Sequence, residues 1–102
     1  MASKDTLMLP LRKEWYWAIE GKGRFKNNPK REEYREIKPF WQKRLMNPDG
    51  SFKRYKYVVF SYGYTAKKMC FECKGIYVGK GNPEWGGGCE NVYCIRLGAR
   101  VW

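Results

Sequence analysis

Three ionisable residues stand close together in the segment 29–36, namely Lys30, Glu33 and Arg35. In a β-strand, Glu33 and Arg35 share a face because side chains repeat with a period of two. Lys30 falls on the opposite face of a strand, but it can turn onto the Glu33 face if a loop ends beside it. Two cations around one carboxylate can bind a phosphate, orient a nucleobase or transfer protons. The alternative is a solvated edge strand with ordinary surface ion pairs.

Two further segments carry aromatic and polar side chains that suit a nucleotide. A glycine-rich loop at 79–88 contains Asn82, Glu84 and Trp85. Trp85 can stack on a base, and Asn82 or Glu84 can read a base edge. The alternative is a hairpin connection with Trp85 folded back as an apolar plug. Tyr64 lies near the end of an expected strand and is a second stacking candidate, or it packs the end of a barrel.

The charge of the chain favours a polyanionic partner. Among 102 residues, 21 are Lys or Arg and 10 are Asp or Glu, for a net charge of +11. Residues 22–54 hold eleven of the bases and four of the acids. Within them, Lys22, Arg24 and Lys26 alternate around Phe25, and we expect these three to contact backbone phosphates. RNA or a nucleotide is the expected partner, with DNA as an alternative. The excess of bases can also serve solubility alone.

The residue types exclude several chemistries. The chain has no histidine, which excludes Ser-His and Cys-His catalysis and histidine metal sites. Of its four cysteines, Cys70 and Cys73 have a zinc-like spacing, but a strand at 68–78 turns their side chains to opposite faces. We interpret Cys73 and Cys94 as small buried apolar residues. The sequence therefore predicts neither a metal site nor a cofactor.

Hydrophobic periodicity predicts two helices and four strands in a single domain, 1–102. The helices are expected at 8–20, with Pro10 in the first turn, and at 40–46. The strands are expected at 31–37, 55–62, 67–78 and 92–97. This order predicts an α+β fold with a small, mostly antiparallel curled sheet or β-barrel. Neither a signal peptide nor a membrane span is expected, so we predict a soluble, cytoplasmic protein without membrane contact.

Three phrases of the chain resemble small stand-alone bacterial or phage members of the ASCH family, a branch of the PUA-like superfamily. They are 9–15 (LPLRKEW), 33–41 (EYREIKPFW) and 79–86 (GKGNPEWG). The family's signature lysine, glutamate and arginine fall on Lys30, Glu33 and Arg35. The resemblance implies a PUA-like barrel with an N-terminal helix and a second short helix. It also implies that RNA or a modified nucleotide binds in a cleft beside the barrel.

The resemblance also implies a possible hydrolase. Some ASCH members deacylate acetylated cytidine with the motif lysine, a threonine and a glutamate, and Glu33 holds the place of that threonine here. Others are reported as ribonucleases; there Lys30 or Arg35 would stabilise the pentavalent phosphate and Glu33 would be the general base. Glu84 is a further candidate carboxylate. A binding domain, a metal-independent hydrolase and a protein-interaction module all remain open, as does the oligomeric state.

Overall fold

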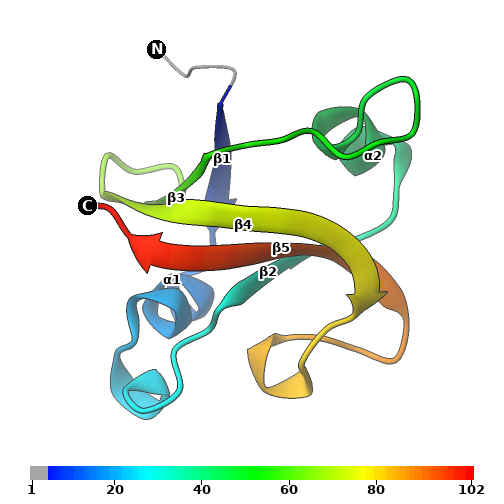
Figure 1. Ribbon diagram of the computed structural model, residues 1–102. Helices are drawn as coiled ribbons and strands as arrows, with labels where there is room; N and C mark the ends of the chain where they lie inside the picture. Colours follow the sequence, from blue (N-terminus) through cyan, green and yellow to red (C-terminus); the bar gives the residue numbers. More distant parts are fainter. Residues whose placement is uncertain (1–4) are drawn as a thin grey trace.

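The computed structural model describes residues 5–102 and shows a curled five-stranded sheet flanked by two α-helices (Figure 1). The sheet consists of β1 (Thr6–Leu11), β2 (Glu32–Arg35), β3 (Tyr57–Tyr62), β4 (Lys68–Lys80) and β5 (Asn91–Arg100). The helices are α1 (Lys13–Glu20) and α2 (Pro39–Leu45), and two single 3-10 turns, η1 (Gly23–Phe25) and η2 (Pro83–Trp85), lie in loops.

The strands follow the order β1-β3-β4-β5-β2. β1 pairs with β3 in parallel, and the three other pairs are antiparallel. The long β4 bends strongly (Figure 1), and its register against β5 shifts on both sides of Cys73. Such bulges increase the local twist and bend of a strand. The result is an α+β fold with a mostly antiparallel sheet, as predicted, but the sheet is a half-barrel whose edge strands β1 and β2 share no ladder.

The start of the chain corrects the expected helix at 8–20. Residues Thr6–Leu11 form β1, and the helix begins only at Lys13. Leu7, Leu9 and Leu11 are buried in alternation, the period of a half-buried strand. Pro10 fits here because it lies on an edge strand, where a missing N–H costs no ladder hydrogen bond. The helical spacing of apolar residues corresponds to a helix only from residue 13 onward.

One apolar cluster holds the sheet and both helices together. α1 contributes Tyr16 and Ile19, and α2 contributes Leu45, to the same cluster as the buried residues of β1, β3, β4 and β5. Tyr16 packs edge-on against Tyr62 of β3, with ring centroids 5.4 Å apart. The helices lie on different sides of the sheet: α1 is at the lower left, below the C-terminal end of β5, and α2 is at the upper right, above the bend of β4 (Figure 1).

The cysteines are all free thiols. Cys94 is fully buried, as expected, and burial raises the pKa of its thiol. Cys73 is only half-buried, whereas Cys70 is buried because the chain's last residues run back beside it; its N–H donates to the Trp102 carbonyl at 2.7 Å. Within residues 5–102 no three Cys, Asp or Glu residues converge as metal ligands. The helices in this range are also too short or too polar to cross a lipid bilayer.

Candidate functional site

The side chains of Lys30, Glu33 and Arg35 converge, as the sequence predicted. The Lys30 ammonium donates to Glu33 Oε1 at 2.7 Å, and Arg35 Nη1 donates to Glu33 Oε2. Lys30 and Glu33 are only 2% and 3% exposed, while Arg35 is half-buried. The cluster is therefore a buried carboxylate shared by two cations. It is unlike the solvated surface ion pairs that the sequence left as the alternative.

Lys30 reaches Glu33 because it precedes β2 and belongs to the loop before it. Its backbone N–H donates to the Ala18 carbonyl of α1 at 2.8 Å, which ties the loop to the helix. β2 itself pairs with β5, where Glu33 lies opposite Ile95. The bond to α1 thus positions Lys30, and the ladder with β5 positions Glu33. This arrangement confirms the expected turn of Lys30 onto the Glu33 face.

Aromatic rings surround the two cations of the cluster. The Lys30 ammonium lies 4.4 Å from the ring centre of Trp15 and 5.3 Å from that of Tyr34. Arg35 Cζ lies 5.0 Å from the ring centre of Trp41. Cation–π contacts of this kind stabilise a cation that has lost water. Burial nonetheless lowers the pKa of Lys30, and the Glu33 carboxylate opposes that shift.

Two arginines join the open edge of β1 to the elements beside it. Arg35 Nη2 donates to the Pro10 carbonyl at 3.3 Å, and Arg44 Nη2 of α2 donates to the Met8 carbonyl at 3.1 Å. Alternate carbonyls of an edge strand point the same way, so both guanidinium groups cover one free edge. Arg35 therefore bridges the two edge strands of the half-barrel. We call this junction of β1 and β2 the seam.

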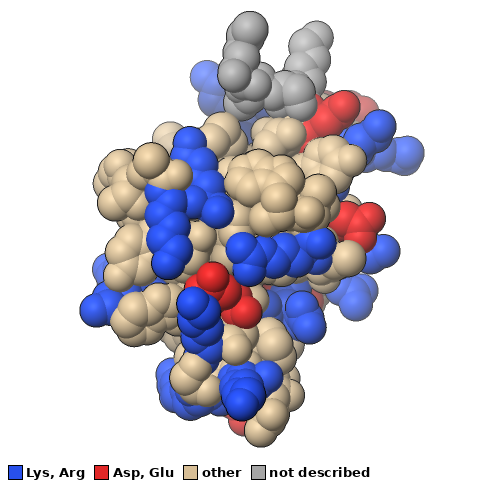
Figure 2. Space-filling view, turned by 90° about the vertical axis from the view of Figure 1, so that its left-hand side faces the viewer, with Lys and Arg blue, Asp and Glu red and all other residues tan. Residues whose placement is uncertain are grey.

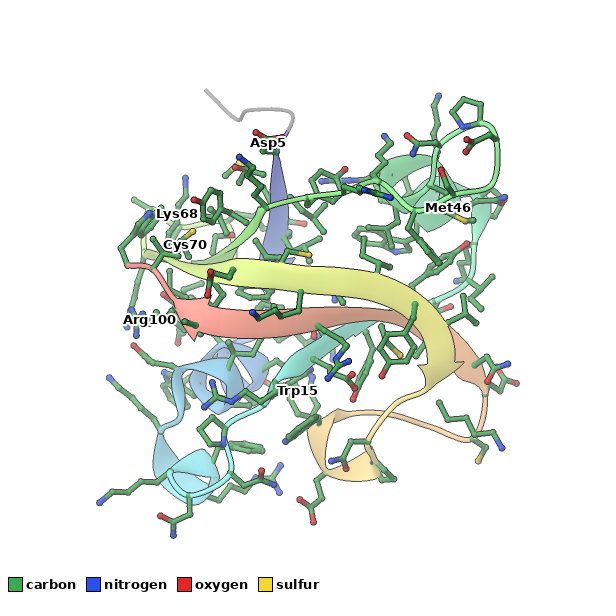
Figure 3. The ribbon with its side chains drawn as sticks, viewed as in Figure 1. Asp5, Trp15, Met46, Lys68, Cys70 and Arg100 are labelled. Carbon is green, nitrogen blue, oxygen red and sulfur yellow. The ribbon has the colours of Figure 1, made fainter. Side chains whose placement is uncertain are left out.

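A hollow of about 250 Å³ opens at the seam. Its walls come from the end of β1, the start of α1 and from β2: Pro10, Leu11, Arg12, Trp15, Glu33 and Arg35. The Trp15 side chain extends from α1 toward the loop that carries η2 (Figure 3). Glu33 and Arg35 thus line a solvent-accessible hollow. Lys30 does not line it, and donates its hydrogen bond to Glu33 from the buried side. We call this space the seam hollow.

Arg12 is the charged residue of the seam hollow that was not predicted from the sequence. Its side chain is exposed and forms no ion pair or hydrogen bond with any other part of residues 5–102. Arg35 uses three of its five N–H donors on Glu33 and on two carbonyls, so two have no acceptor within residues 5–102. The hollow therefore offers spare cationic donors beside a carboxylate. The only signal in the sequence was the position of Arg12 inside the ASCH-like phrase 9–15.

The glycine-rich loop packs against the aromatic side of the cluster. The Asn82 N–H donates to the Tyr34 hydroxyl at 2.8 Å, and Asn28 donates to Glu84 at 3.1 Å. A Cβ on Gly86 would lie 3.0 Å from the Trp15 ring, so the loop backbone approaches that ring closely. Trp85 is half-buried, and its indole N–H is buried with no partner within residues 5–102. The arrangement places Asn82, Glu84 and Trp85 near the cluster but outside the walls of the seam hollow.

The other predicted binding residues lie on the outer surface. Lys22, Arg24 and Lys26 are exposed on the connection between α1 and β2. Lys22 lies 3.6 Å from Glu20, and Arg24 Cζ lies 4.5 Å from the Phe25 ring centre. Figure 2 shows the face that carries this end of the molecule, with Lys and Arg side chains spread over it around a few carboxylates. Tyr64 is 97% exposed, on the turn between β3 and β4, and does not line the seam hollow.

A larger hollow lies away from the cluster. It measures about 740 Å³ and is lined mainly by the segment 51–55 with Asn47 and Thr6. Lys53 and Arg54 make it basic, but it contains no carboxylate, no buried ion pair and no tryptophan among its walls. Size alone favours this hollow, whereas convergent polar groups favour the seam hollow. We assign the candidate site to the seam hollow for that reason.

Comparison with known proteins adds no relative: the chain matches no protein-family model, no curated protein and no solved structure. The assignment of a function therefore depends on the geometry of the seam and on the residues that line it.

Proposed function

We propose that the chain binds RNA or a nucleotide at the seam hollow. The observation that carries this proposal is that Arg12 and Arg35 line the same hollow as Glu33. Within residues 5–102, the Arg12 side chain has no hydrogen-bond or ion-pair partner and Arg35 keeps two unused donors. Guanidinium groups suit phosphate oxygens, and a carboxylate next to them can accept from a base edge. The hollow is smaller than the usual range for drug-sized ligands, about 300–1,000 Å³, so it suits one phosphate or one base of a longer strand.

The resemblance to the ASCH family supports the same proposal. The signature residues Lys30, Glu33 and Arg35 form one cluster, and that cluster borders a cleft at the edge of a curled sheet. We propose that the half-barrel is an open form of a PUA-like barrel, in which Arg35 spans the gap between β1 and β2. The net charge of +11 supplies the long-range attraction that a polyanion needs.

The salt dependence of binding tests this proposal. Affinity for a labelled single-stranded RNA, measured by fluorescence anisotropy, should fall linearly with the logarithm of salt concentration. Arg12→Ala removes one phosphate contact, so the slope should decrease by about 0.7. Arg54→Ala, in the larger hollow, is the matched control and should leave the slope unchanged. Salt-insensitive binding, or a loss with Arg54→Ala rather than Arg12→Ala, would contradict the proposal.

A second proposal is metal-independent cleavage of RNA at the same place. It is favoured by the position of Glu33, which lines the seam hollow while two cations hold it from the protein side. Glu33 would take the proton of the attacking 2′-hydroxyl, and Arg35 would stabilise the charge on the phosphate. The new bond to phosphorus closes a cyclic phosphate as the P–O5′ bond breaks, and the leaving 5′-oxygen takes a proton from water. The hollow's walls within residues 5–102 include no Ser, Thr or Cys, which argues against a covalent acyl intermediate in amide hydrolysis. Incubation of RNA with the protein in EDTA tests this, since intact RNA after prolonged incubation would refute cleavage.

A further inference from the structure

α2 presents an aromatic side chain to solvent close to the seam. Phe40 is 62% exposed, although the helix has an apolar anchor in Leu45, which is fully buried. The Phe40 ring meets the half-buried Trp41 edge-on, with centroids 4.9 Å apart and planes at 85°. Trp41 therefore supports Phe40 from one side, while most of the Phe40 side chain stays exposed to solvent. An exposed, supported aromatic ring is the kind of surface on which an unpaired base stacks.

Guanidinium groups hold this aromatic pair in place. Arg44 Cζ lies 5.9 Å from the Phe40 ring centre and 5.6 Å from that of Trp41, and Arg35 approaches Trp41 within 5.0 Å. Because Arg44 and Arg35 also bond to the β1 edge at Met8 and Pro10, they are fixed by backbone acceptors. We call Phe40, Trp41 and Arg44 the α2 platform. Arg35 touches the platform and lines the seam hollow, so the two surfaces adjoin.

The charge around the α2 platform indicates the chemistry of its partner. Residues 35–54 contain six Lys or Arg and two acids, a net charge of +4. Both acids are already engaged: Glu36 pairs with Lys38 at 2.7 Å, and Asp49 accepts from Ser51 at 2.9 Å. A partner that is both anionic and rich in flat rings complements such a surface. Single-stranded RNA has both properties, because its bases are unstacked and its backbone is charged.

We propose that the α2 platform stacks one base of a single-stranded RNA whose neighbouring nucleotide occupies the seam hollow. This inference rests on the proposed function of the seam hollow and adds that the ligand is a strand, not an isolated nucleotide. It moves the stacking role from Tyr64 and Trp85, which the sequence favoured, to Phe40. Phe40 packs on Trp41, which Arg35 of the cluster approaches, whereas Tyr64 is on the β3–β4 turn, far from α2 in Figure 1.

The test compares a ligand that reaches one site with a ligand that reaches both. The probes are uridine monophosphate, followed by calorimetry, and a short oligouridylate with one 2-aminopurine, followed by fluorescence. Phe40→Ala should weaken oligonucleotide binding about fivefold or more, the loss of one stacked base, and should leave the monophosphate unaffected. Phe40→Trp should retain both affinities. Stacking on the protein should also change the 2-aminopurine emission in wild type and not in Phe40→Ala.

The outcomes separate this inference from the proposed function. If Arg12→Ala weakens both probes but Phe40→Ala weakens neither, the seam hollow binds nucleotides and the α2 platform does not. Oligonucleotide binding that fails with Tyr64→Ala in place of Phe40→Ala would overturn the platform and locate stacking on the β3–β4 turn. The same RNA affinity and 2-aminopurine emission in wild type and Phe40→Ala would also overturn it. The exposed ring would then be left as a contact for a protein partner.

Discussion

Replacement of Glu33 by glutamine removes the only anion of the buried cluster while it keeps the shape of the side chain. Glu33 is 3% exposed and accepts from both Lys30 and Arg35. A glutamine has one carbonyl oxygen, so its amide group would direct donor hydrogens at one of the two cations. Lys30 is 2% exposed and would then be a buried ammonium with no opposite charge beside it. We expect this variant to lose more stability than any other single change in the cluster.

The size of the loss follows from what each substitution leaves behind. Removal of one partner of a buried ion pair costs about 3–5 kcal/mol, because the remaining charge is uncompensated. Lys30→Met leaves Glu33 still bonded to Arg35, so it removes only a charged hydrogen bond, worth about 1.5–3 kcal/mol. The apolar methionine also relieves the burial of a charge. Glu33→Gln should therefore be the more destabilising variant by about 2 kcal/mol.

Urea unfolding followed by circular dichroism measures both variants. With a typical slope of about 1–3 kcal/mol per molar urea, Glu33→Gln should lower the midpoint by about 1 M or more. The double variant Lys30→Met/Glu33→Gln should lose less than the sum of the single losses, because it no longer buries an unpaired ammonium. Equal losses, or a greater loss in Lys30→Met, would show that Glu33 is not the shared anion and would refute the reasoning.

Two further perturbations test the surroundings of the cluster. Burial lowers the Lys30 pKa below its ordinary value of 10.5. At pH values between the lowered pKa and 10.5, the unfolded chain binds more protons than the folded chain, so the contribution of Lys30 to the free energy of unfolding rises with pH. Wild type should gain stability relative to Lys30→Met as the pH approaches 10.5, and a constant difference in urea titrations would speak against the lowered pKa. In the glycine-rich loop, a Cβ on Gly87 would lie 2.2 Å from the Gly81 carbonyl carbon, whereas a Cβ on Gly88 meets nothing within 4 Å. Gly87→Ala should cost about 1–3 kcal/mol and Gly88→Ala less than about 0.5, and equal melting temperatures would show that the loop does not hold this close approach.

The strands of the second half and the helix α2 could be predicted because their signals are local. Short runs rich in β-branched and aromatic residues mark β3 and β5, and Pro39 at the start of α2 marks a helix. The convergence of Lys30 on Glu33 was also predictable, since Pro29 favours a loop next to it and the period of two pairs Glu33 with Arg35. These features depend on neighbours within a few residues of one another.

β1 was mispredicted because its decisive partner is remote. Leu7, Leu9 and Leu11 alternate as in a strand, but Leu11 also continues the helical spacing of Trp15 and Ile19. Both patterns are compatible with the local sequence. The parallel ladder with β3, from Thr6 opposite Tyr57 to Leu11 opposite Tyr62, favours the strand. A pairing across some fifty residues leaves no mark on periodicity within a short window.

The amino-acid sequence determined which charged and aromatic groups the site contains and which of them share a strand face. Only the tertiary structure decided that Lys30 is buried behind Glu33, and that Arg12 and Arg35 face the seam hollow in its place. The physical reason is that exposure depends on what packs on a residue from elsewhere in the chain. Here the curl of the sheet brings β1 to the edge of β2, and that approach creates both the hollow and the spare guanidinium donors beside it.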